Sequence, residues 1–348
     1  MNKAVIRAGL ETLYFSGMHW LASQFLAGAG VILTFHRVRP ARSDAFQPNR
    51  LLEITPEFLD EVLVALAAND IEVIPIGQLP GRLVDPRLGR FAVLTFDDGY
   101  RDNVEYALPI LERHGAASTL FVPTAFAAGT GELWWLAIEE AVARHDRIEI
   151  ALGGRPRVFD CATPEAKAET YDAINGHLMD HAGQAEFVAA VRDLAGRYGV
   201  DLHAQCREAC IGWRELQDLA ERPLVTIGSH TITHPILSKL GEEDARAEIF
   251  GGIAGLEAAL GRRPEHFSYP VGGPQAARAR EFAIAAALGV KVGVTTRPGV
   301  LFPEHADCLT ALPRISINGE FQRRRYLDVL LSGAATGLMN RFRRVAAA

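Results

Sequence analysis

The chain is short of cysteine and of long apolar runs. Four cysteines among 348 residues are too few for the dense disulfide framework of a small secreted protein, so reduced thiols are expected. No run of about 18 apolar residues is present, so no membrane-spanning helix is expected. An excess of positive charge is also lacking, and the net charge of -6 argues against nucleic acid as the main partner.

The first residues lack the pattern of a cleavable signal peptide, because Arg7, Glu11 and His19 interrupt the apolar stretch. A cytoplasmic location is therefore expected. Residues 1–30 are instead typical of an amphipathic helix, and residues 319–348 of a basic helix. Both are expected to pack on the body of the protein, or alternatively to make peripheral contact with a membrane surface.

A first candidate metal site lies in the middle of the chain. His203, Cys206 and Cys210 are spaced so that all three lie near one face of a helix, which is compatible with zinc. A fourth ligand is not evident, however. Ordinary packing of the helix is therefore the interpretation that we prefer.

Apolar residues make up 49% of the chain, which is enough for a sizeable core. Short apolar runs alternate with helical stretches, and each run predicts a strand that is buried on both faces of a parallel sheet. The runs span residues 31–35, 71–76, 91–96, 118–122, 225–228, 267–269, 290–295 and 312–317. Seven or eight such units predict an α/β fold in the form of a closed or nearly closed barrel.

Residues 129–215 break this rhythm and predict an insertion. They contain Trp134 and Trp135, a possible short strand over residues 147–151, and then alanine- and charge-rich helical sequence. We therefore expect a barrel made of residues 31–128 and 216–318, with a mostly helical cap beside its cleft. The two tryptophans either offer a sugar-stacking face or anchor the insertion to the barrel.

Two adjacent carboxylates, Asp97 and Asp98, directly follow the apolar run 91–96. Barrels build their active sites at the carboxyl ends of strands, and buried charges are costly there. A turn at Gly99 allows both carboxylates to approach one site. The alternative is that Asp98 or Asp102 caps the helix that follows.

Two histidines, His230 and His234, follow the apolar run 225–228. Because they are four residues apart, they are predicted to lie on one face of a helical turn and to bind one metal ion. With one aspartate they supply two nitrogens and one carboxylate. Such a set leaves positions for water and substrate, as a catalytic zinc site requires.

A third signal is the segment 267–273, which contains an aromatic–Pro–x–Gly turn at a predicted strand end. Such a turn can direct a backbone N–H outward, which suits an oxyanion hole. Tyr269 and Pro270 of this turn are expected to contact the substrate. His36, after the first predicted strand, and Trp134 of the insertion are further expected substrate contacts.

Together these pieces resemble the polysaccharide deacetylase family, also called the NodB-homology domain or carbohydrate esterase family four. The resemblance rests on Thr-Phe-Asp-Asp-Gly at 95–99 and Ser-His-Thr-Ile-Thr-His-Pro at 229–235. With weaker similarities elsewhere, it covers most of residues 31–318 outside the insertion. It implies a distorted (β/α) barrel and one divalent metal, usually zinc, although the ligands also suit cobalt or nickel.

The resemblance also implies a role for each matching residue. Asp97 would be the general base, and Asp98, His230 and His234 would be the metal ligands. The backbone N–H of Val271 would face the oxyanion of the tetrahedral intermediate. An attacking water would then lose its proton to the base, and an acid would protonate the leaving amine.

Two departures from the family's pattern affect this assignment. Members often carry an arginine where this chain has Ser268, and a late histidine that acts as general acid and is absent here. Arg314 of the last predicted strand is expected to supply the missing charge beside Asp97, with a surface ion pair as the alternative. The proton donor stays open between His36 and His305.

We therefore expect a metal-dependent hydrolase that binds carbohydrate. It would remove N-acetyl groups from an oligosaccharide, polysaccharide or glycolipid that contains N-acetylglucosamine. One alternative is an amidase or imidase that acts on a small non-sugar substrate. Another is a catalytically weak glycan-binding module, which the missing late histidine favours and the intact set of carboxylates and imidazoles disfavours.

Overall fold

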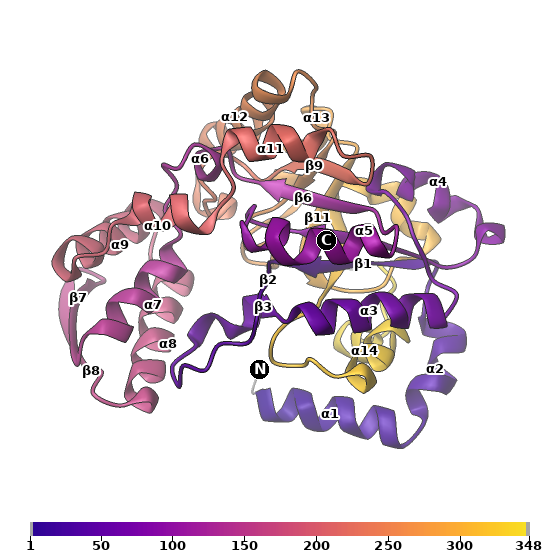
Figure 1. Ribbon diagram of the computed structural model, residues 1–348, viewed down its shortest axis with the longest axis horizontal. Helices are drawn as coiled ribbons and strands as arrows, with labels where there is room; N and C mark the ends of the chain where they lie inside the picture. The colour runs from indigo at the N-terminus through magenta and orange to yellow at the C-terminus, as the bar shows by residue number, and fades with distance from the viewer. Residues whose placement is uncertain (1–2, 346–348) are drawn as a thin grey trace.

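Eight parallel strands form the central sheet of the computed structural model, which describes residues 3–345 (Figure 1). In spatial order they are β1 (Gly30–Phe35), β12 (Leu312–Ser316), β11 (Val292–Pro298), β10 (His266–Ser268), β9 (Val225–Ser229), β6 (Ser118–Val122), β5 (Phe91–Phe96) and β4 (Glu72–Val73). Because β1 also pairs with β5, seven strands close into a barrel, and β4 lies against the start of β5. The predicted α/β barrel of seven to eight parallel strands is confirmed.

The barrel is distorted on one side. β9 and β10 share a single paired position, at Ser229 and Phe267, and the register of β11 against β12 shifts between Val294 and Pro298. In contrast, β1 and β5 pair without interruption over six positions. The regular side carries the two aspartates, whereas the irregular side carries the turn that follows β10.

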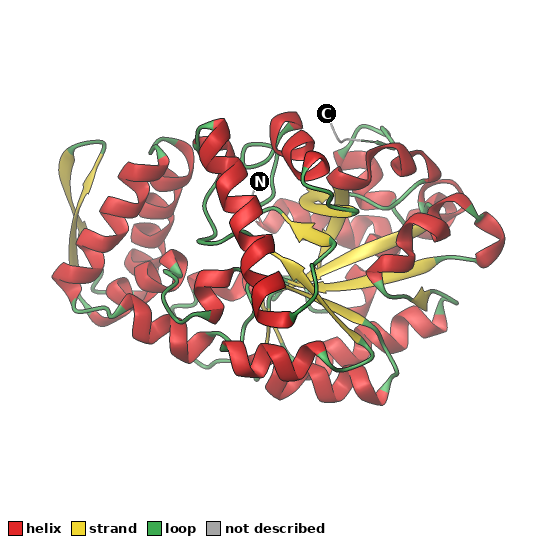
Figure 2. Cartoon of the chain, turned by 90° about the horizontal axis from the view of Figure 1, so that it is seen from above, coloured by secondary structure: helices red, strands yellow, loops and turns green. Residues whose placement is uncertain are grey.

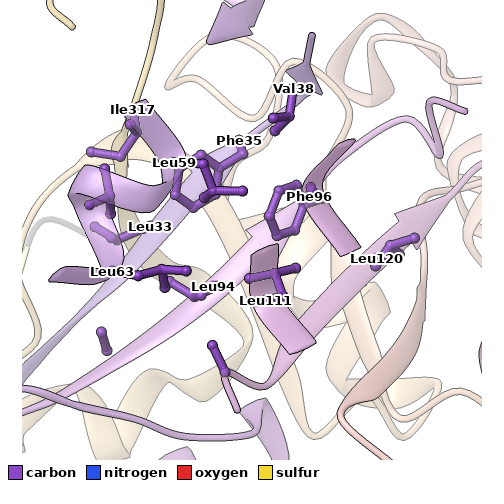
Figure 3. Packing of buried hydrophobic residues seen from close by; sticks show 14 of the residues in the cluster. Leu33, Phe35, Val38, Leu59, Leu63, Leu94, Phe96, Leu111, Leu120 and Ile317 are labelled. Atoms are coloured by element: carbon purple, nitrogen blue, oxygen red, sulfur yellow. The ribbon is translucent and has the colours of Figure 1, made fainter. Parts of the chain in front are cut away.

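Side chains of the barrel strands alternate between the outer layer and the barrel interior. Leu33 and Leu94 point outward into the layer that α3 (Pro56–Ala68) covers, where Leu63 of this helix lies beside Leu94 (Figure 3). Val93 points the other way, into a second apolar cluster inside the barrel. Inward-facing residues at the carboxyl ends of the strands therefore project into the barrel mouth.

Helices cover the outside of the barrel. Thr55 caps the start of α3, because its Oγ1 accepts a hydrogen bond from the N–H of Phe58 at 3.2 Å, and Pro56 occupies the first turn. The π-helical segment η4 (Asn103–Ala107) follows the two aspartates. The remaining helices of this layer are α4 (Leu79–Val84), α5 (Leu108–Arg113), α6 (Thr124–Ala127), α11 (Trp213–Ala220), α12 (Glu242–Leu260) and α13 (Ala279–Ala287).

The insertion forms a lobe at one end of the barrel (Figure 2). It consists of α7 (Trp134–Arg144), β7 (Arg147–Leu152), β8 (Arg155–Asp160), α8 (Pro164–Asp180), α9 (Gln184–Tyr198) and α10 (Leu202–Ala209). An antiparallel hairpin takes the place of the single short strand expected over residues 147–151. Ile138, Ile174 and Leu194 belong to an apolar cluster that lies mainly within this lobe.

The two ends of the chain form four helices, whereas the sequence predicts two. These are α1 (Lys3–Phe15), α2 (Met18–Leu26), α14 (Arg324–Leu331) and α15 (Ala334–Met339). Gly17 and Gly333 interrupt the expected helices with φ values of +72° and +74°, a left-handed conformation that favours glycine. The outermost positions of both expected helices, residues 1–2 and 346–348, lie outside the described residues.

The four terminal helices share one apolar cluster, which includes Leu10 of α1, Ala22 of α2, Tyr326 and Val329 of α14, and Ala334 of α15. None of the helices in the described part of the chain combines the length and apolar character that crossing a bilayer requires. Contacts among α1, α2, α14 and α15 make these helices a bundle, and α14 packs against α3 of the barrel.

Candidate active site

Asp97 takes the next inward-facing position after the end of β5. Its side chain lies in the barrel mouth and is 2% exposed. Its carboxylate accepts a bidentate pair of hydrogen bonds from Arg314, with Nη1 2.9 Å from Oδ1 and Nη2 2.6 Å from Oδ2. Ser268 Oγ donates a further hydrogen bond to Oδ2 at 3.1 Å. Burial raises the pKa of Asp97, but the charge and hydrogen bonds of Arg314 outweigh it and hold this pKa well below its usual range. Asp97 is therefore an ionised carboxylate with a fixed orientation.

Arg314 is held as firmly as the carboxylate it contacts. It is 1% exposed, its Nε donates to the carbonyl of Thr295 at 2.8 Å, and its Nη1 donates to Thr95 Oγ1 at 3.0 Å. Nη2 also lies 3.0 Å from Ser268 Oγ. The structure thus brings Arg314 to Asp97 as the sequence predicts, and a buried fork of this kind is not a surface ion pair.

Asp98 turns away from the strand direction and faces the same cleft. Its φ is +71°, and Gly99 follows with a φ of +65°. A Cβ atom on Gly99 would lie 3.1 Å from Cγ1 of Val122, so both conformation and space favour glycine. Asp98 Oδ1 is buried and has no hydrogen-bond partner among the described residues. An unpaired buried carboxylate oxygen indicates a missing positive partner.

The two histidines lie in an irregular loop after β9, and the predicted helical turn is wrong. Thr231 and His234 have φ values of +70° and +61°, and Thr231 Oγ1 accepts a hydrogen bond from the N–H of His234 at 3.0 Å. Glu248 of α12 accepts two backbone hydrogen bonds, each 3.0 Å long, from residues 232 and 233. These contacts, and not helical periodicity, bring the His230 and His234 rings together.

The side chains of Asp98, His230 and His234 fit a divalent metal. Asp98 Oδ1 lies 3.5 Å from His230 Nε2 and 3.3 Å from His234 Nε2. Ligand atoms about 2.1 Å from a tetrahedral metal lie about 3.4 Å apart, which matches these separations. His230 Nδ1 lies 2.6 Å from the Ser268 carbonyl, which fixes the tautomer and leaves Nε2 as the ligand atom. Burial lowers the pKa of His234 to about 4 and keeps its ring in the neutral form that binds metals.

The candidate metal site of His203, Cys206 and Cys210 does not form. Cys206 and Cys210 are buried, with their Sγ atoms near the carbonyls of Phe126 and Asp98 at 3.6 and 3.7 Å, whereas His203 is exposed. Within residues 3–345, only Asp98, His230 and His234 gather three potential ligand atoms. Helix packing therefore accounts for these cysteines.

Left-handed backbone is concentrated at the site. Seven described residues other than glycine have positive φ, and four of them are Asp98, Thr231, His234 and Val271. Such conformations are costly and tend to persist where function requires them. The Val271 carbonyl accepts a hydrogen bond from Thr296 Oγ1 at 2.6 Å, and its N–H has no partner in the described part of the chain. This N–H is therefore available to an oxyanion.

A pocket of about 470 Å³ lies over these groups. The barrel contributes Thr34, His36, Asp97, Asp98, His230, His234, Val271, Thr296, Arg314 and Ser316, and the insertion contributes Trp134, Trp135, Tyr171, Asp172, Asn175 and Met179. Lys3 of α1 and four residues of η1 (Pro48–Leu52) complete the lining. The insertion thus forms one wall of the cleft.

Tyr269 and Pro270 are not brought into this pocket. Tyr269 is fully buried on the outward-facing side of β10, where its hydroxyl donates to the Thr310 carbonyl at 2.8 Å and its ring packs on Phe282. Pro270 is buried beside it. Strand alternation gives Ser268 the inward position and Tyr269 the outward one.

The two candidate proton donors are separated by the fold. His36 lines the pocket, its carbonyl accepts a hydrogen bond from Asn103 Nδ2 at 2.7 Å, and burial lowers the pKa of its ring. His305 lies outside the pocket lining. Its Nδ1 accepts a hydrogen bond from the N–H of Phe302 at 3.0 Å.

Several residues of the site carry no signal in the sequence. Asn49 joins η1 to the insertion, because its Nδ2 donates to the Trp135 carbonyl at 3.0 Å and its Oδ1 accepts from the Tyr171 hydroxyl at 2.8 Å. Glu248 also carries no signal in the sequence, because it lies 15 and 16 residues along the chain from the two loop residues that it holds. Thr95, in contrast, could have been found by counting back two positions from Asp97 along the strand.

The barrel is closed and parallel, and its carboxylates and imidazoles lie at the carboxyl ends of the strands. Enzymes with this fold build their active sites at that end. The family model for polysaccharide deacetylase matches residues 85–293. This is more than half of the chain, and the chain belongs to the polysaccharide deacetylase family.

Solved structures share the fold at low sequence identity. The Streptococcus pyogenes deacetylase PplD in complex with acetate is 18% identical, with a TM-score of 0.54 over 83% of this chain and 92% of that one. IcaB from Ammonifex degensii is 16% identical, with a TM-score of 0.54 over 88% and 97%. BC0361, a polysaccharide deacetylase from Bacillus cereus, is 14% identical, with a TM-score of 0.54 over 86% and 68%. No curated protein sequence matches the chain.

The two tryptophans of the insertion differ in their surroundings. Trp135 is 4% exposed, and its Nε1 donates to the Tyr100 hydroxyl at 2.7 Å, which ties the insertion to the barrel. Trp134 is half-buried, lines the pocket and packs edge-on against Trp135 and Phe187. Trp135 therefore anchors the insertion, whereas Trp134 is placed to contact a ligand.

Truncation of each tryptophan should therefore have a different effect. We expect Trp135→Ala to lower the free energy of unfolding by about 3–5 kcal/mol, because it removes a buried ring and a hydrogen bond. Trp134→Ala should raise KM about threefold to tenfold through the loss of one aromatic contact. Denaturant unfolding and steady-state kinetics measure the two effects. Trp213→Ala, which removes a half-buried ring outside the pocket, is the control and should leave KM unchanged.

Proposed function

We propose that the chain is a metal-dependent deacetylase that removes N-acetyl groups from a substrate containing N-acetylglucosamine. The substrate is an oligosaccharide, a polysaccharide or a glycolipid. The observation that carries this proposal is the ionised Asp97, held by Arg314 beside the ligand atoms of Asp98, His230 and His234.

Asp98, His230 and His234 would hold one divalent metal ion, zinc by ligand chemistry, although cobalt and nickel also fit. When bound there, the ion would supply Lewis-acid activation of the water and of the amide carbonyl. Asp97 accepts the proton of the attacking water, and Arg314 keeps the carboxylate in one plane while the O–C bond forms. The N–H of Val271 donates a hydrogen bond to the oxyanion. The C–N bond then breaks, the amine takes up a proton, and acetate leaves.

His36 is the proton donor that we retain for the leaving amine. It lines the pocket together with Asp97 and Asp98, whereas His305 does not. Burial lowers the pKa of His36, so its protonated form gives up a proton more readily than an exposed histidine does.

The polar lining supports a hydroxyl-rich substrate over a small amide or imide. Asn175 Oδ1 and Thr34 Oγ1 are buried, and no hydrogen-bond partner is found for either among residues 3–345. Both residues line the pocket, where Asp172 adds a further acceptor. Sugar hydroxyls would satisfy these atoms, whereas a cyclic imide offers few donors.

Acetate release from a panel of N-acetylated oligosaccharides, with metal analysis of the same sample, tests the proposal. We expect about one equivalent of metal and acetate released in step with free amine. Hydrolysis of small imides without acetate release would favour the imidase alternative. Bound metal and sugar without any turnover would identify a glycan-binding module.

Replacing Arg314 with lysine tests the orientation of the base. We expect Arg314→Lys to lower kcat about 100-fold with metal content unchanged, because lysine cannot form the bidentate fork on Asp97. Steady-state kinetics and metal analysis measure this. Arg37→Lys is the control, since Arg37 pairs with Asp102 outside the pocket through a single hydrogen bond of 2.7 Å and not through a fork. Equal losses in the two variants would refute the orienting role.

A further inference from the structure

Exposed apolar side chains gather on the terminal helices. Of the sixteen large hydrophobic residues exposed in the described chain, ten lie in α1, α2, α15 and residues 340–345. Phe15, Trp20, Phe25 and Phe342 are 74%, 65%, 78% and 62% exposed. Clusters of exposed aromatic rings are rare on proteins that meet only water, and they mark a contact surface. We call these helices, with residues 340–345, the terminal face.

α2 presents an uncharged apolar surface to the outside. Its nine residues include no acidic or basic side chain apart from His19, and none of them is fully buried. At 100° per residue, Met18, Trp20, Leu21 and Phe25 fall within one outward arc, with Gln24 as the polar member. A solvent-facing helix normally carries charges on this side.

The C-terminal segment continues this apolar surface. Phe25 and Phe342 line one groove of about 160 Å³, together with Arg343 and Arg344. The N–H of Phe342 donates to the Gly337 carbonyl at 2.7 Å, which holds the ring beside α2. Two parts of the chain more than 300 residues apart thus build one surface.

The charge of the terminal face is positive, although the whole chain has a net charge of -6. Residues 3–28 and 332–345 contain one acidic side chain, Glu11, and it pairs with Arg325 at 2.6 Å. Arg7, Arg341 and Arg343 are exposed and have no carboxylate partner among residues 3–345. Aromatic rings flanked by arginines suit the surface of a membrane, where the rings contact acyl chains and the arginines contact anionic headgroups.

We propose that the terminal face docks on an anionic lipid bilayer. The rings of Trp20, Phe25 and Phe342 enter the interface, and Arg341 and Arg343 lie at the level of the lipid phosphates. A symmetric contact with a second copy of the chain would bring these arginines toward their own counterparts, which is repulsive. The proposal is independent of the reaction that the pocket performs.

Vesicle flotation tests the docking. The full chain should float with vesicles of phosphatidylglycerol mixed with phosphatidylcholine, and far less with phosphatidylcholine alone. The double variant Trp20→Ser, Phe25→Ser should lower the partition coefficient by about tenfold or more. Arg341→Gln with Arg343→Gln should remove the preference for phosphatidylglycerol. Phe250→Ser is the matched control, because Phe250 is a 50% exposed ring on α12.

A direct probe accompanies flotation. Tryptophan emission should shift to shorter wavelength with anionic vesicles, and Trp20→Phe should abolish the shift while the protein still floats. Unchanged thermal unfolding shows that the variants are folded. Failure of the natural chain to float, or equal flotation of the Trp20→Ser, Phe25→Ser variant, overturns the proposal. So does a dimer in solution that this variant converts to monomers, because the face is then an interface between copies.

Discussion

Asp97→Asn is expected to lower kcat by about 1000-fold and to leave the bound metal in place. Asparagine fills the volume of the aspartate but cannot accept a proton from the attacking water. Asp97 is not part of the Asp98, His230 and His234 group, whose ligand atoms converge on one another. Acetate release and metal analysis on the same preparation measure the two outcomes.

This variant also removes the partner of a buried arginine. Arg314 is 1% exposed, and an unpaired charge at such a position costs about 3–5 kcal/mol of stability. Asp102→Asn is the matched control, because Asp102 is 7% exposed and pairs with Arg37 outside the pocket. If Asp102→Asn lost activity to the same extent, destabilisation would explain the result. If Asp97→Asn lost its metal, the two adjacent aspartates would have exchanged roles.

The barrel could be predicted from the sequence because its strands are buried on both faces. Residues 91–96 and 118–122 are continuous apolar runs, and the structure begins and ends β5 and β6 at these same positions. The breaks in the terminal helices were harder to predict. A glycine inside a helical pattern is often tolerated, and only tertiary contacts decide whether it ends the helix.

The residues that line the pocket were more predictable than the backbone conformation that places them. Asp97, Asp98, His230 and His234 follow strand ends, and the structure gathers all four around the pocket. The backbone conformation of the loop at 230–234 depends on contacts from outside the loop. Glu248 holds this loop, and no local sequence pattern connects Glu248 to it. Propensity rules assign a regular turn in such cases because they do not include the partner.

Strand alternation explains which expected contacts fail. In β12, Leu312 and Arg314 point inward and Ile315 points outward, so an arginine at this position reaches the barrel mouth. The same rule directs Tyr269 away from the cleft, although its motif suggested a substrate contact. Applying the period of two to each motif residue would have separated these cases from sequence alone.

The double variant His230→Ala, His234→Ala is expected to lose its metal and its activity together. It leaves Asp98 as the remaining ligand of the group, and one carboxylate does not hold zinc against water or a chelator. We expect metal content to fall from about one equivalent to near zero, and acetate release to fall by at least about 1000-fold, since water activation and oxyanion stabilisation are both lost. Elemental analysis after dialysis and acetate assays measure these values.

The chain offers a control with the same residue types at the same spacing. His177 and His181 are also four residues apart. His177 lies in the last turn of α8 and His181 directly follows this helix, with ring centroids separated by 5.5 Å, and no carboxylate is gathered with them in the described structure. His177→Ala with His181→Ala should therefore keep both metal and activity. Full occupancy in the His230→Ala, His234→Ala protein would show that the metal binds elsewhere. Retained activity without metal would mean that Asp97 and Val271 suffice, and that the imidazoles serve only to shape the loop.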